Sequence, residues 1–501
     1  MNNYDLRSMS PLNNLPLSDP GPFGAGFGNK PSYTTDQAAK QLSRENLRFH
    51  DRNGDSKVDV NYTVDSSFTS QQQRRVRQAA QSWQDVANIN FREQAGGTDG
   101  TLNIRNNPRG DRGVATSPNR STSNTTATIG TLRESASPTL GSHFSVTAIH
   151  EIGHAIGLHH PGHYNGGTPN YQTGAAYAED TKGRTVMSYF SEKNQKAHDF
   201  KGQNPSAPMM DDIAAAQRLY GANHQTRNTD TTYGFNSNTE REAMTLKSAA
   251  DKPVFCVWDG GGVDTMDFSG FSQDQNINLN AESFSDVGGM KGNVSIAKGC
   301  TIENAIGGAG RDNLSGNEAA NWIKGGGKGD SLRGGGADTF VYDKASDSTP
   351  TDPDMIEDFT SGTDKIDVSG ALKDAGVSGL VFTDRFTGKA GEAMLMHDAS
   401  TGHSSLAIDL KGTGNAALLL KSKGEIKPAD VLWGGKAPEV QPSPTPTPTP
   451  APAPAPLPDK AQDSVAGLIQ MFAISVLAFF SQLMSALTPS SDQASAKKTQ
   501  P

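Results

Sequence analysis

Residues 150–165 read HEIGHAIGLHHPGHYN and hold five of the eleven histidines of the chain together with one glutamate. His150 and His154 are four residues apart, so on a helix both imidazoles leave the same face, one turn from each other. That geometry lets two ring nitrogens reach one zinc ion at about 2.0 to 2.1 Å. Gly157 then allows the helix to stop and the chain to turn, which brings His160 round as a third ligand. Three protein ligands leave one position open, as in a catalytic rather than a structural zinc site.

The glutamate in this segment suits a different task. Glu151 is placed to take a proton from a water that zinc activates, rather than to bind the metal. HExxH alone could be a helix with solvent-facing histidines, but the glycine and the third histidine at fixed distances favour a metal site. His159 and His163 fall outside this pattern, and we expect them at the surface or next to the ligands.

The full pattern HExxHxxGxxH resembles the zinc signature of the metzincins. Pro161 directly follows the third histidine, and in this the segment resembles the serralysin branch. The serralysins are secreted bacterial metalloproteases, often called alkaline proteases. TVMSYF at 185–190 resembles the Met-turn of that family. The resemblance implies that Met187 lies beneath the zinc as a packing floor, and that Tyr189 can occupy a further zinc position and swing to hold the oxyanion.

The family implies a zinc endopeptidase that hydrolyses peptide bonds in proteins, with Glu151 as general base. GNKPSYTTDQAAKQL near the start and APMMDDIAAAQRLYG at 207–221 extend the resemblance, which runs from about Gly28 to Trp433. In the family an edge strand above the cleft pairs with an extended substrate. We expect TLNIRN at 101–106 to be that strand. A non-enzymatic alternative is a calcium-dependent surface or adhesion protein with an inactive protease domain, but the intact Glu151, the three histidines and Tyr189 argue against it.

Length and composition set the frame for these motifs. At roughly 150 residues per domain, 501 residues predict two or three domains plus tails. A hydrophobic fraction of 34%, with 54 glycines and 28 prolines, favours β structure, turns and linkers over a helical bundle. The net charge of -9 is spread without a basic stripe, which argues against a nucleic-acid partner. Cys256 and Cys300 could form one bridge or stay as two thiols.

Helical spacing begins near Thr35, and RRVRQAAQSWQDVANI at 74–89 predicts a second helix whose apolar face includes Val76 and Trp83. INFRE and TLNIRN alternate as strands around a Gly96-Gly97 turn. In DRNGDSKVD, at 51–59, the early spacing of a calcium loop lacks the required Gly and Glu, so a β-turn is favoured.

The second half contains glycine-rich repeats. GGAGRDNLS at 307–315 matches the calcium-binding nonapeptide GGxGxDxUx of RTX proteins, and units starting at 316, 325 and 334 keep a nine-residue register. A plain glycine-rich linker is the alternative, which the fixed period disfavours. In a parallel β-roll each turn stacks on the one eighteen residues away, so we expect one good calcium site between the first and third units and at most a weak one on the other side. The expected ligand residues are Gly307, Gly308, Gly310, Asp312, Gly325, Gly326 and Asp330.

No N-terminal export signal can be read in the first twenty residues, so the resemblance implies secretion through a type I exporter that reads a signal near the C-terminus. GEIKPADVLW at 424–433 looks like the usual end of the family, yet the chain continues. After a proline-alternating linker, Val465–Leu487 is a run of 23 residues without charge whose polar members share one side of a helix. An export signal, an anchor on a membrane surface and a transmembrane span all remain open for this amphipathic helix.

Together these patterns predict an α+β metzincin catalytic domain followed by an all-β parallel β-roll or sandwich, with zinc and calcium as cofactors. The expected partners are protein substrates and the exporter, and the expected location is extracellular. The expected segments are 1–30 (disordered, possible propeptide), 31–224 (catalytic domain), 225–433 (calcium-binding roll), 434–460 (Pro-rich linker) and 461–501 (helical tail).

Overall fold

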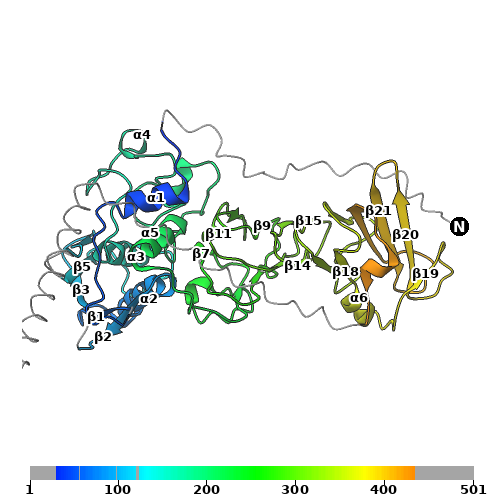
Figure 1. Ribbon diagram of the computed structural model, residues 1–501, viewed down its shortest axis with the longest axis horizontal. Coiled ribbons are helices and arrows are strands. Elements are labelled where there is room, and N and C mark those ends of the chain that lie inside the picture. Colours follow the sequence, from blue (N-terminus) through cyan, green and yellow to red (C-terminus); the bar gives the residue numbers. More distant parts are fainter. Residues whose placement is uncertain (1–29, 56, 97–98, 120–122, 435–501) are drawn as a thin grey trace, which may run out of the picture. The chain divides into compact units, whose positions relative to one another are not determined.

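The structure is a computed structural model that describes residues 30–434 except 56, 97–98 and 120–122. Its longer helices lie in the blue to green part of the ribbon, and most of its short strands lie in the green to orange part (Figure 1). The elements of the first part are α1 (Thr35–Leu42), β1 (Val58–Val64), α2 (Ser70–Val86), β2 (Ile89–Glu93), β3 (Gly100–Asn107), β4 (Val114–Ala115), β5 (Asn124–Gly130), α3 (His143–Ala155), α4 (Tyr171–Gly174), the 3-10 helix η1 (Glu192–Asn194) and α5 (Met210–Tyr220).

The two helices expected from the sequence are present. α2 begins with a capping box, in which the Thr69 side chain accepts the Gln72 backbone N–H and the Gln72 side chain accepts the Thr69 N–H. Its expected apolar face is buried, and Trp83 donates from Nε1 to the Ile149 carbonyl of α3 at 3.0 Å. This bond and the packing around it fix α3, the helix that carries the histidines, against α2.

The five-stranded sheet has the order β2-β1-β3-β5-β4. INFRE and TLNIRN do form strands, but they do not pair as a hairpin: β2 and β3 lie on either side of β1 and pair with it in parallel. β3 is therefore an interior strand between β1 and β5, and the prediction that 101–106 is the edge strand was wrong. The edge next to β5 is the two-residue β4, the antiparallel strand of this sheet.

The second part is a coil of parallel strands, as expected from the repeats. Strands from alternate turns build most of two sheets, one ordered β23-β18-β16-β14-β12-β8-β6 and one ordered β19-β20-β21-β22-β17-β15-β13-β9. In the second sheet β20, β21 and β22 pair antiparallel with their neighbours in this run. A small sheet β10-β11-β7 is separate from both. The elements are β6 (Thr232–Gly234), η2 (Glu242–Met244), β7 (Phe255–Val257), β8 (Thr265–Asp267), β9 (Asn276–Asn278), β10 (Phe284–Ser285), β11 (Val294–Ile296), β12 (Asn304–Ile306), β13 (Asn313–Ser315), β14 (Trp322–Lys324), β15 (Ser331–Arg333), β16 (Thr339–Val341), β17 (Asp354–Ile356), β18 (Lys365–Asp367), α6 (Ser369–Asp374), β19 (Val381–Phe382), β20 (Glu392–Asp398), β21 (His403–Asp409), β22 (Leu418–Lys423), η3 (Pro428–Asp430) and β23 (Val431–Leu432).

Stacking at eighteen residues is confirmed for the first and third repeat units, where Leu314 pairs with Leu332 and both are fully buried. The nine-residue register does not extend through the fourth unit. Ile323 pairs with Phe340, one residue short of the expected offset. The reason is that Asp338 stands one place earlier in its unit than Asp312 and Asp330 do in theirs.

Aspartate carboxylates link turns of the coil by accepting hydrogen bonds from backbone N–H groups. The Asp312 N–H donates to Asp330 Oδ1 at 2.7 Å, and the Asp330 N–H donates to Asp354 Oδ1 at 2.9 Å. On the other side the Asp338 N–H donates to Asp364 Oδ1 at 3.0 Å. Each buried backbone donor is thus satisfied by a carboxylate from a later turn.

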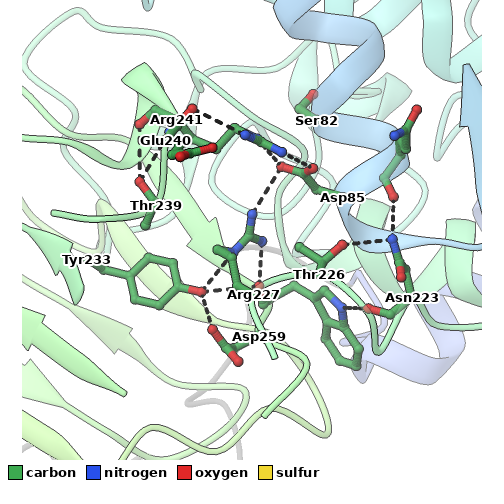
Figure 2. A network of polar contacts seen from close by, with 12 residues as sticks. Ser82, Asp85, Asn223, Thr226, Arg227, Tyr233, Thr239, Glu240, Arg241 and Asp259 are labelled. Atoms are coloured by element: carbon green, nitrogen blue, oxygen red, sulfur yellow. Dashed lines mark hydrogen bonds and ion pairs between the residues drawn. The ribbon is translucent and has the colours of Figure 1, made fainter. Parts of the chain in front are cut away.

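The helical part and the coil are joined by a buried ion pair. Asp85 of α2 accepts from both Arg241 Nε and Nη2, at 2.7 and 2.9 Å, and from Arg227 Nη1 at 3.1 Å (Figure 2). Arg227 also donates from Nε to the Tyr233 hydroxyl, which donates to Asp259 Oδ2 at 2.7 Å. A chain of polar contacts therefore runs from a helix of the first part to a carboxylate of the second.

Several expectations concern residues outside those described: the N-terminal segment up to residue 29, the linker and the C-terminal helix. Within the described ranges, no helix is both long and apolar enough to cross a bilayer. Cys256 and Cys300 are two buried free thiols. In the 51–59 turn, Asp51 Oδ1 accepts the Gly54 N–H, a bond typical of a turn closed by an aspartate.

Candidate active site

The three histidines of the motif share one hydrogen-bonding arrangement. Each Nδ1 lies within 2.7 to 2.8 Å of a backbone carbonyl: Val186 for His150, Leu158 for His154 and Tyr164 for His160. A carbonyl can only accept, so each Nδ1 carries the proton and each Nε2 keeps its lone pair. The three carbonyls therefore fix the tautomer that a metal-binding imidazole requires.

These lone pairs point at one another. His160 Nε2 lies 3.2 Å from His150 Nε2 and 2.9 Å from His154 Nε2. Burial lowers the pKa of His154 to about 3 and that of His160 to about 4, so neither ring is protonated at neutral pH. Three neutral acceptors with no proton between them repel unless a cation lies among them. The donor set fits zinc, and it is the one such group of histidine, cysteine or acidic side chains in the described part of the chain.

α3 ends where the motif predicts. The helix stops at Ala155, and Gly157 has a φ of +110° with a position for a Cβ only 1.8 Å from the Leu47 carbonyl oxygen. A side chain here would meet both a disfavoured backbone conformation and a steric clash. The prediction that this glycine allows the chain to turn toward His160 is confirmed.

Glu151 lies on α3 between the first two ligands and is 4% exposed. Its Oε2 is buried and has no hydrogen-bond partner among the described residues. Burial raises the pKa of this carboxyl to about 8 in the absence of a metal ion. An unpartnered carboxylate oxygen beside three convergent imidazoles is suited to accept a proton from water.

The turn that contains Met187 lies against the helix that carries His150 and His154. A Cβ on Gly153 would lie 2.7 Å from Met187 Sδ, so the glycine inside the motif leaves room for the buried methionine. Asp212 of α5 holds the turn in place, because its carboxylate accepts from Thr185 Oγ1 at 2.5 Å and from the Val186 N–H at 2.7 Å. The sequence placed Met187 here but did not reveal Asp212.

Tyr189 completes the group of rings around the histidines. Its ring centroid lies 4.6 Å from that of His160 and 5.8 Å from that of His150. Its hydroxyl accepts the Gly166 N–H at 3.4 Å. The ring is therefore next to the metal-binding nitrogens while the hydroxyl is held by one long hydrogen bond.

The remaining residues of the motif stand apart from the trio. His163 is exposed, and the His159 ring is half-buried with its Nε2 3.8 Å from Glu45. The edge strand β4 was not predicted from the sequence. Gly113, directly before this strand, lies next to Glu151, and a Cβ on Gly113 would be 2.1 Å from Glu151 Oε1. A glycine at the start of a two-residue strand gives no periodic signal from which it could have been found.

The coil holds buried carboxylates beyond those of the repeats in two groups: Asp354 lies beside Asp330, and Asp264 lies beside Asp259 and Glu303. Asp264 Oδ2, Asp330 Oδ2 and Asp354 Oδ2 are buried without a hydrogen-bond partner among the described residues. Burial, and then the neighbouring carboxylates, raise the pKa of Asp264 to about 9 and that of Asp330 to about 10. The predicted glycines form tight turns beside them; a Cβ on Gly325 would lie 2.2 Å from Asp330 Oδ2. Asp264 and Asp354 are outside the repeats and were missed.

Three neutral imidazoles with convergent lone pairs, a buried carboxylate beside them and a short edge strand next to that carboxylate define a zinc metalloendopeptidase. Residues 45–206 match the family described as metallo-peptidase family M12B, reprolysin-like, and residues 222–432 match the C-terminal family of peptidase M10 serralysins. The chain belongs to the serralysin family, as its similarity to known members shows.

Three relatives illustrate the extent of this similarity. The chain is 47% identical to metallopeptidase AprA of Pseudomonas marginalis over 444 residues, which cover 81% of this chain and 92% of the relative. It is 47% identical to a serralysin of Photorhabdus luminescens over 69% of this chain and 75% of the relative. Serralysin C of Dickeya chrysanthemi is 43% identical over 80% of this chain and 91% of its own length. The match includes the helical part and the coil together.

Proposed function

We propose that His150, His154 and His160 hold the catalytic zinc through Nε2 and that Glu151 is the general base of peptide hydrolysis. When bound, zinc supplies a Lewis acid that polarises the substrate carbonyl and acidifies water. The Glu151 carboxylate takes the proton of the attacking water and returns it to the amine of the leaving peptide. The observation that carries the proposal is the buried, unpartnered Glu151 Oε2 on the same helix turn as two of the convergent imidazoles.

Tyr189 is proposed to donate a hydrogen bond to the substrate oxygen as negative charge develops there. Its hydroxyl has to leave the Gly166 N–H, which is a small loss because that contact is 3.4 Å long. β4, as the edge of the sheet, is proposed to pair with an extended substrate, which places the scissile bond next to Glu151. Main-chain pairing of this kind accepts many protein sequences.

The test is Glu151→Ala, assayed for casein cleavage and for zinc content after dialysis. We expect cleavage to be lost while one zinc per chain remains, because the three ligands are untouched. Tyr189→Phe should lower kcat with little change in KM, since its hydroxyl acts on charge that forms during reaction. Full casein cleavage by Glu151→Ala would contradict the assigned role.

The coil is proposed to bind calcium. The expected ligand residues of the repeats, Gly307, Gly308, Gly310, Asp312, Gly325, Gly326 and Asp330, are kept in this proposal. Asp264 and Asp354, whose Oδ2 atoms have no partner in the part of the chain that is described, are added to it. Oxygen ligands in numbers, several of them charged, are what calcium prefers. Calcium titration followed by far-ultraviolet circular dichroism should show added β structure, and an Asp330→Asn chain should require more calcium for the same change.

Secretion and the tail are also proposals. We infer that the protein leaves the cell through a type I exporter and works outside on protein substrates, and that residues 461–501 attach it to a membrane surface. A chain stopped after Trp433 would be compared with the full chain in a Gram-negative host carrying such an exporter. If the short chain reaches the medium and cleaves casein, the signal lies before residue 434. If it stays inside, the extension carries the signal.

A further inference from the structure

Asp180 is a buried carboxylate that the proposed mechanism does not use. It is 0% exposed and lies in the loop between α4 and the Met187 turn. Its Oδ1 accepts two hydroxyl hydrogen bonds, from Tyr164 at 2.8 Å and from Ser188 Oγ at 2.7 Å. Its Oδ2 faces the Ala176 N–H at 3.3 Å. One oxygen atom thus joins two segments that approach the zinc ligands from different sides.

The first segment is the loop that follows the third ligand. Tyr164 supplies the carbonyl that accepts the His160 Nδ1 proton, and its ring stacks on the His160 ring with centroids 5.2 Å apart and an interplanar angle of 21°. Fixing the Tyr164 hydroxyl therefore fixes both the backbone acceptor and one face of the His160 imidazole. Partners of this kind orient a ligand and fix its tautomer.

The second segment is the turn beneath the site. Ser188 follows Met187 and precedes Tyr189, and its Oγ also accepts the Phe190 N–H at 3.1 Å. The Tyr164 ring contacts both Tyr189 and Phe190, with centroids 5.0 Å away in each case. A displacement of either segment would change how the Tyr189 ring lies against His160.

We propose that Asp180 is a positioning residue that ties the His160 loop to the Met187 turn through Tyr164 and Ser188. It thereby sets the orientation of His160 toward zinc and of Tyr189 toward the substrate. This inference rests on the proposed zinc peptidase function but concerns the geometry of the site rather than the chemistry. The carboxylate touches neither metal nor substrate.

The decisive variant is Tyr164→Phe, which removes one hydroxyl and keeps both the stacked ring and the carbonyl. The matched control is Tyr171→Phe. Tyr171 is buried in the same aromatic cluster, contacts Phe190 and donates its hydroxyl hydrogen bond to the Ala178 carbonyl, at 2.7 Å, instead of to Asp180. Both variants lose one buried hydroxyl hydrogen bond of a tyrosine, so their cost in folding stability should be similar.

The readout is the dissociation constant for zinc, measured by competition with a chromophoric chelator on the full chain in calcium. We expect Tyr164→Phe to weaken zinc binding about ten- to a hundredfold, as loss of an outer hydrogen-bond partner does elsewhere, and Tyr171→Phe to stay within about twofold. We expect Asp180→Ala to bind zinc more weakly than Asp180→Asn, because an asparagine Oδ1 can still accept hydrogen bonds from both hydroxyls.

A second measurement distinguishes the link through Tyr164 from the link through Ser188. Ser188→Ala should lower kcat more than it raises KM, because it releases the turn that carries Tyr189, and the Tyr164→Phe/Ser188→Ala double variant should lose less than the sum of the single losses. Zinc binding by Tyr164→Phe as tight as that of Tyr171→Phe, at equal thermal stability, would overturn the proposal. If zinc binding follows the expected order but the parent protein cleaves no casein, the peptidase function fails and the positioning role stands.

Discussion

Gly113 and Glu151 leave no space between them, since a Cβ on Gly113 would lie 2.1 Å from Glu151 Oε1. The first residue of the edge strand follows directly, as β4 begins at Val114. The strand proposed to hold the substrate and the carboxylate proposed to take the proton are thus in contact through a residue that has no side chain. Their separation is set by the backbone rather than by a flexible side chain.

This contact predicts that Gly113→Ala impairs catalysis without loss of metal. The added methyl group must displace Glu151 or β4, and a misplacement of about 1 Å can cost on the order of a hundredfold in rate. We expect kcat/KM for a casein-derived peptide to fall by about that factor, with zinc content unchanged.

Gly96→Ala is the matched control, because Gly96 is exposed in a loop and a Cβ there meets nothing within 4 Å. Its kcat/KM should stay within about twofold of the parent. Equal activities for the two variants would show that Glu151 and β4 adapt to the methyl group without harm.

The end of α3 gives a prediction about stability. Gly157→Ala meets both a φ of +110° and the Leu47 carbonyl oxygen at 1.8 Å, whereas Gly54→Ala meets a φ of +77° in open space. Gly54→Ala should lower the free energy of unfolding by about 1 to 2 kcal/mol, for the backbone conformation alone. Gly157→Ala should lower the free energy of unfolding by more than about 3 kcal/mol and should weaken zinc binding. Urea unfolding and chelator competition would measure the two effects. A loss for Gly157→Ala no larger than that for Gly54→Ala would mean that the chain near Leu47 moves freely.

The Asp85 ion pair predicts how firmly the helical part and the coil are joined. Asp85→Ala leaves Arg227 and Arg241 without their common carboxylate, and removal of one partner from a buried pair typically costs about 3 to 5 kcal/mol. Glu93→Gln is the control: Glu93 also binds an arginine through two hydrogen bonds, to Arg77, but that arginine is 42% exposed. Its loss should cost less than about 1 kcal/mol. Urea unfolding monitored by tryptophan fluorescence would compare the two.

The buried carboxyl groups of Asp264 and Glu303 predict that the calcium-free protein loses stability as the pH rises. Burial, and then neighbouring acids, raise the pKa of Glu303 to about 7 and that of Asp264 to about 9, above the values of an unfolded chain near 4. Between about pH 4 and 9 the calcium-free folded state therefore holds more protons than the unfolded state. Its stability falls as pH rises, by roughly 1.4 kcal/mol per pH unit for each proton held.

The measurement is the thermal midpoint between pH 5 and 9, with a chelator and with excess calcium. The midpoint should decline with rising pH in the chelator and become nearly flat in calcium, since bound calcium would replace the protons. A calcium-free midpoint that rises over this range would show that the carboxylates are ionised before any cation binds.

The zinc trio was predictable because its information is local. A spacing of four on a helix and one glycine determine where His150, His154 and His160 lie, whatever the rest of the chain does. The edge strand was not predictable, because β4 is two residues long and its position depends on pairing with β5, whereas the longer TLNIRN had the stronger alternation. Long-range order between strands leaves no mark on a single segment.

In the coil, too, a local pattern could be predicted from the sequence and the longer-range contacts could not. The nine-residue period placed Asp312 and Asp330 correctly in stacked turns. Asp354 and Asp364 likewise accept a backbone N–H from an earlier turn. They lie 24 and 26 residues from their partners rather than 18, so the period did not predict them. Loops inserted into the coil lengthen the spacing while the contact is retained.

The carboxylates that link the turns also give the coil two unequal ends. Where the accepting carboxylate is buried, as in Thr231 to Asp264, Asp264 to Glu303, Asp312 to Asp330 and Asp338 to Asp364, the donor N–H belongs to the earlier residue and the acceptor to the later one. The bonds to the exposed Asp230 and Asp274 run the other way. Trimming turns from the C-terminal side removes these carboxylate acceptors, whereas trimming from the N-terminal side removes carbonyl acceptors such as that of Asp312, which accepts the Ser331 N–H at 2.9 Å. Shortening from the C-terminal side thus removes charged acceptors, and shortening from the N-terminal side removes neutral ones.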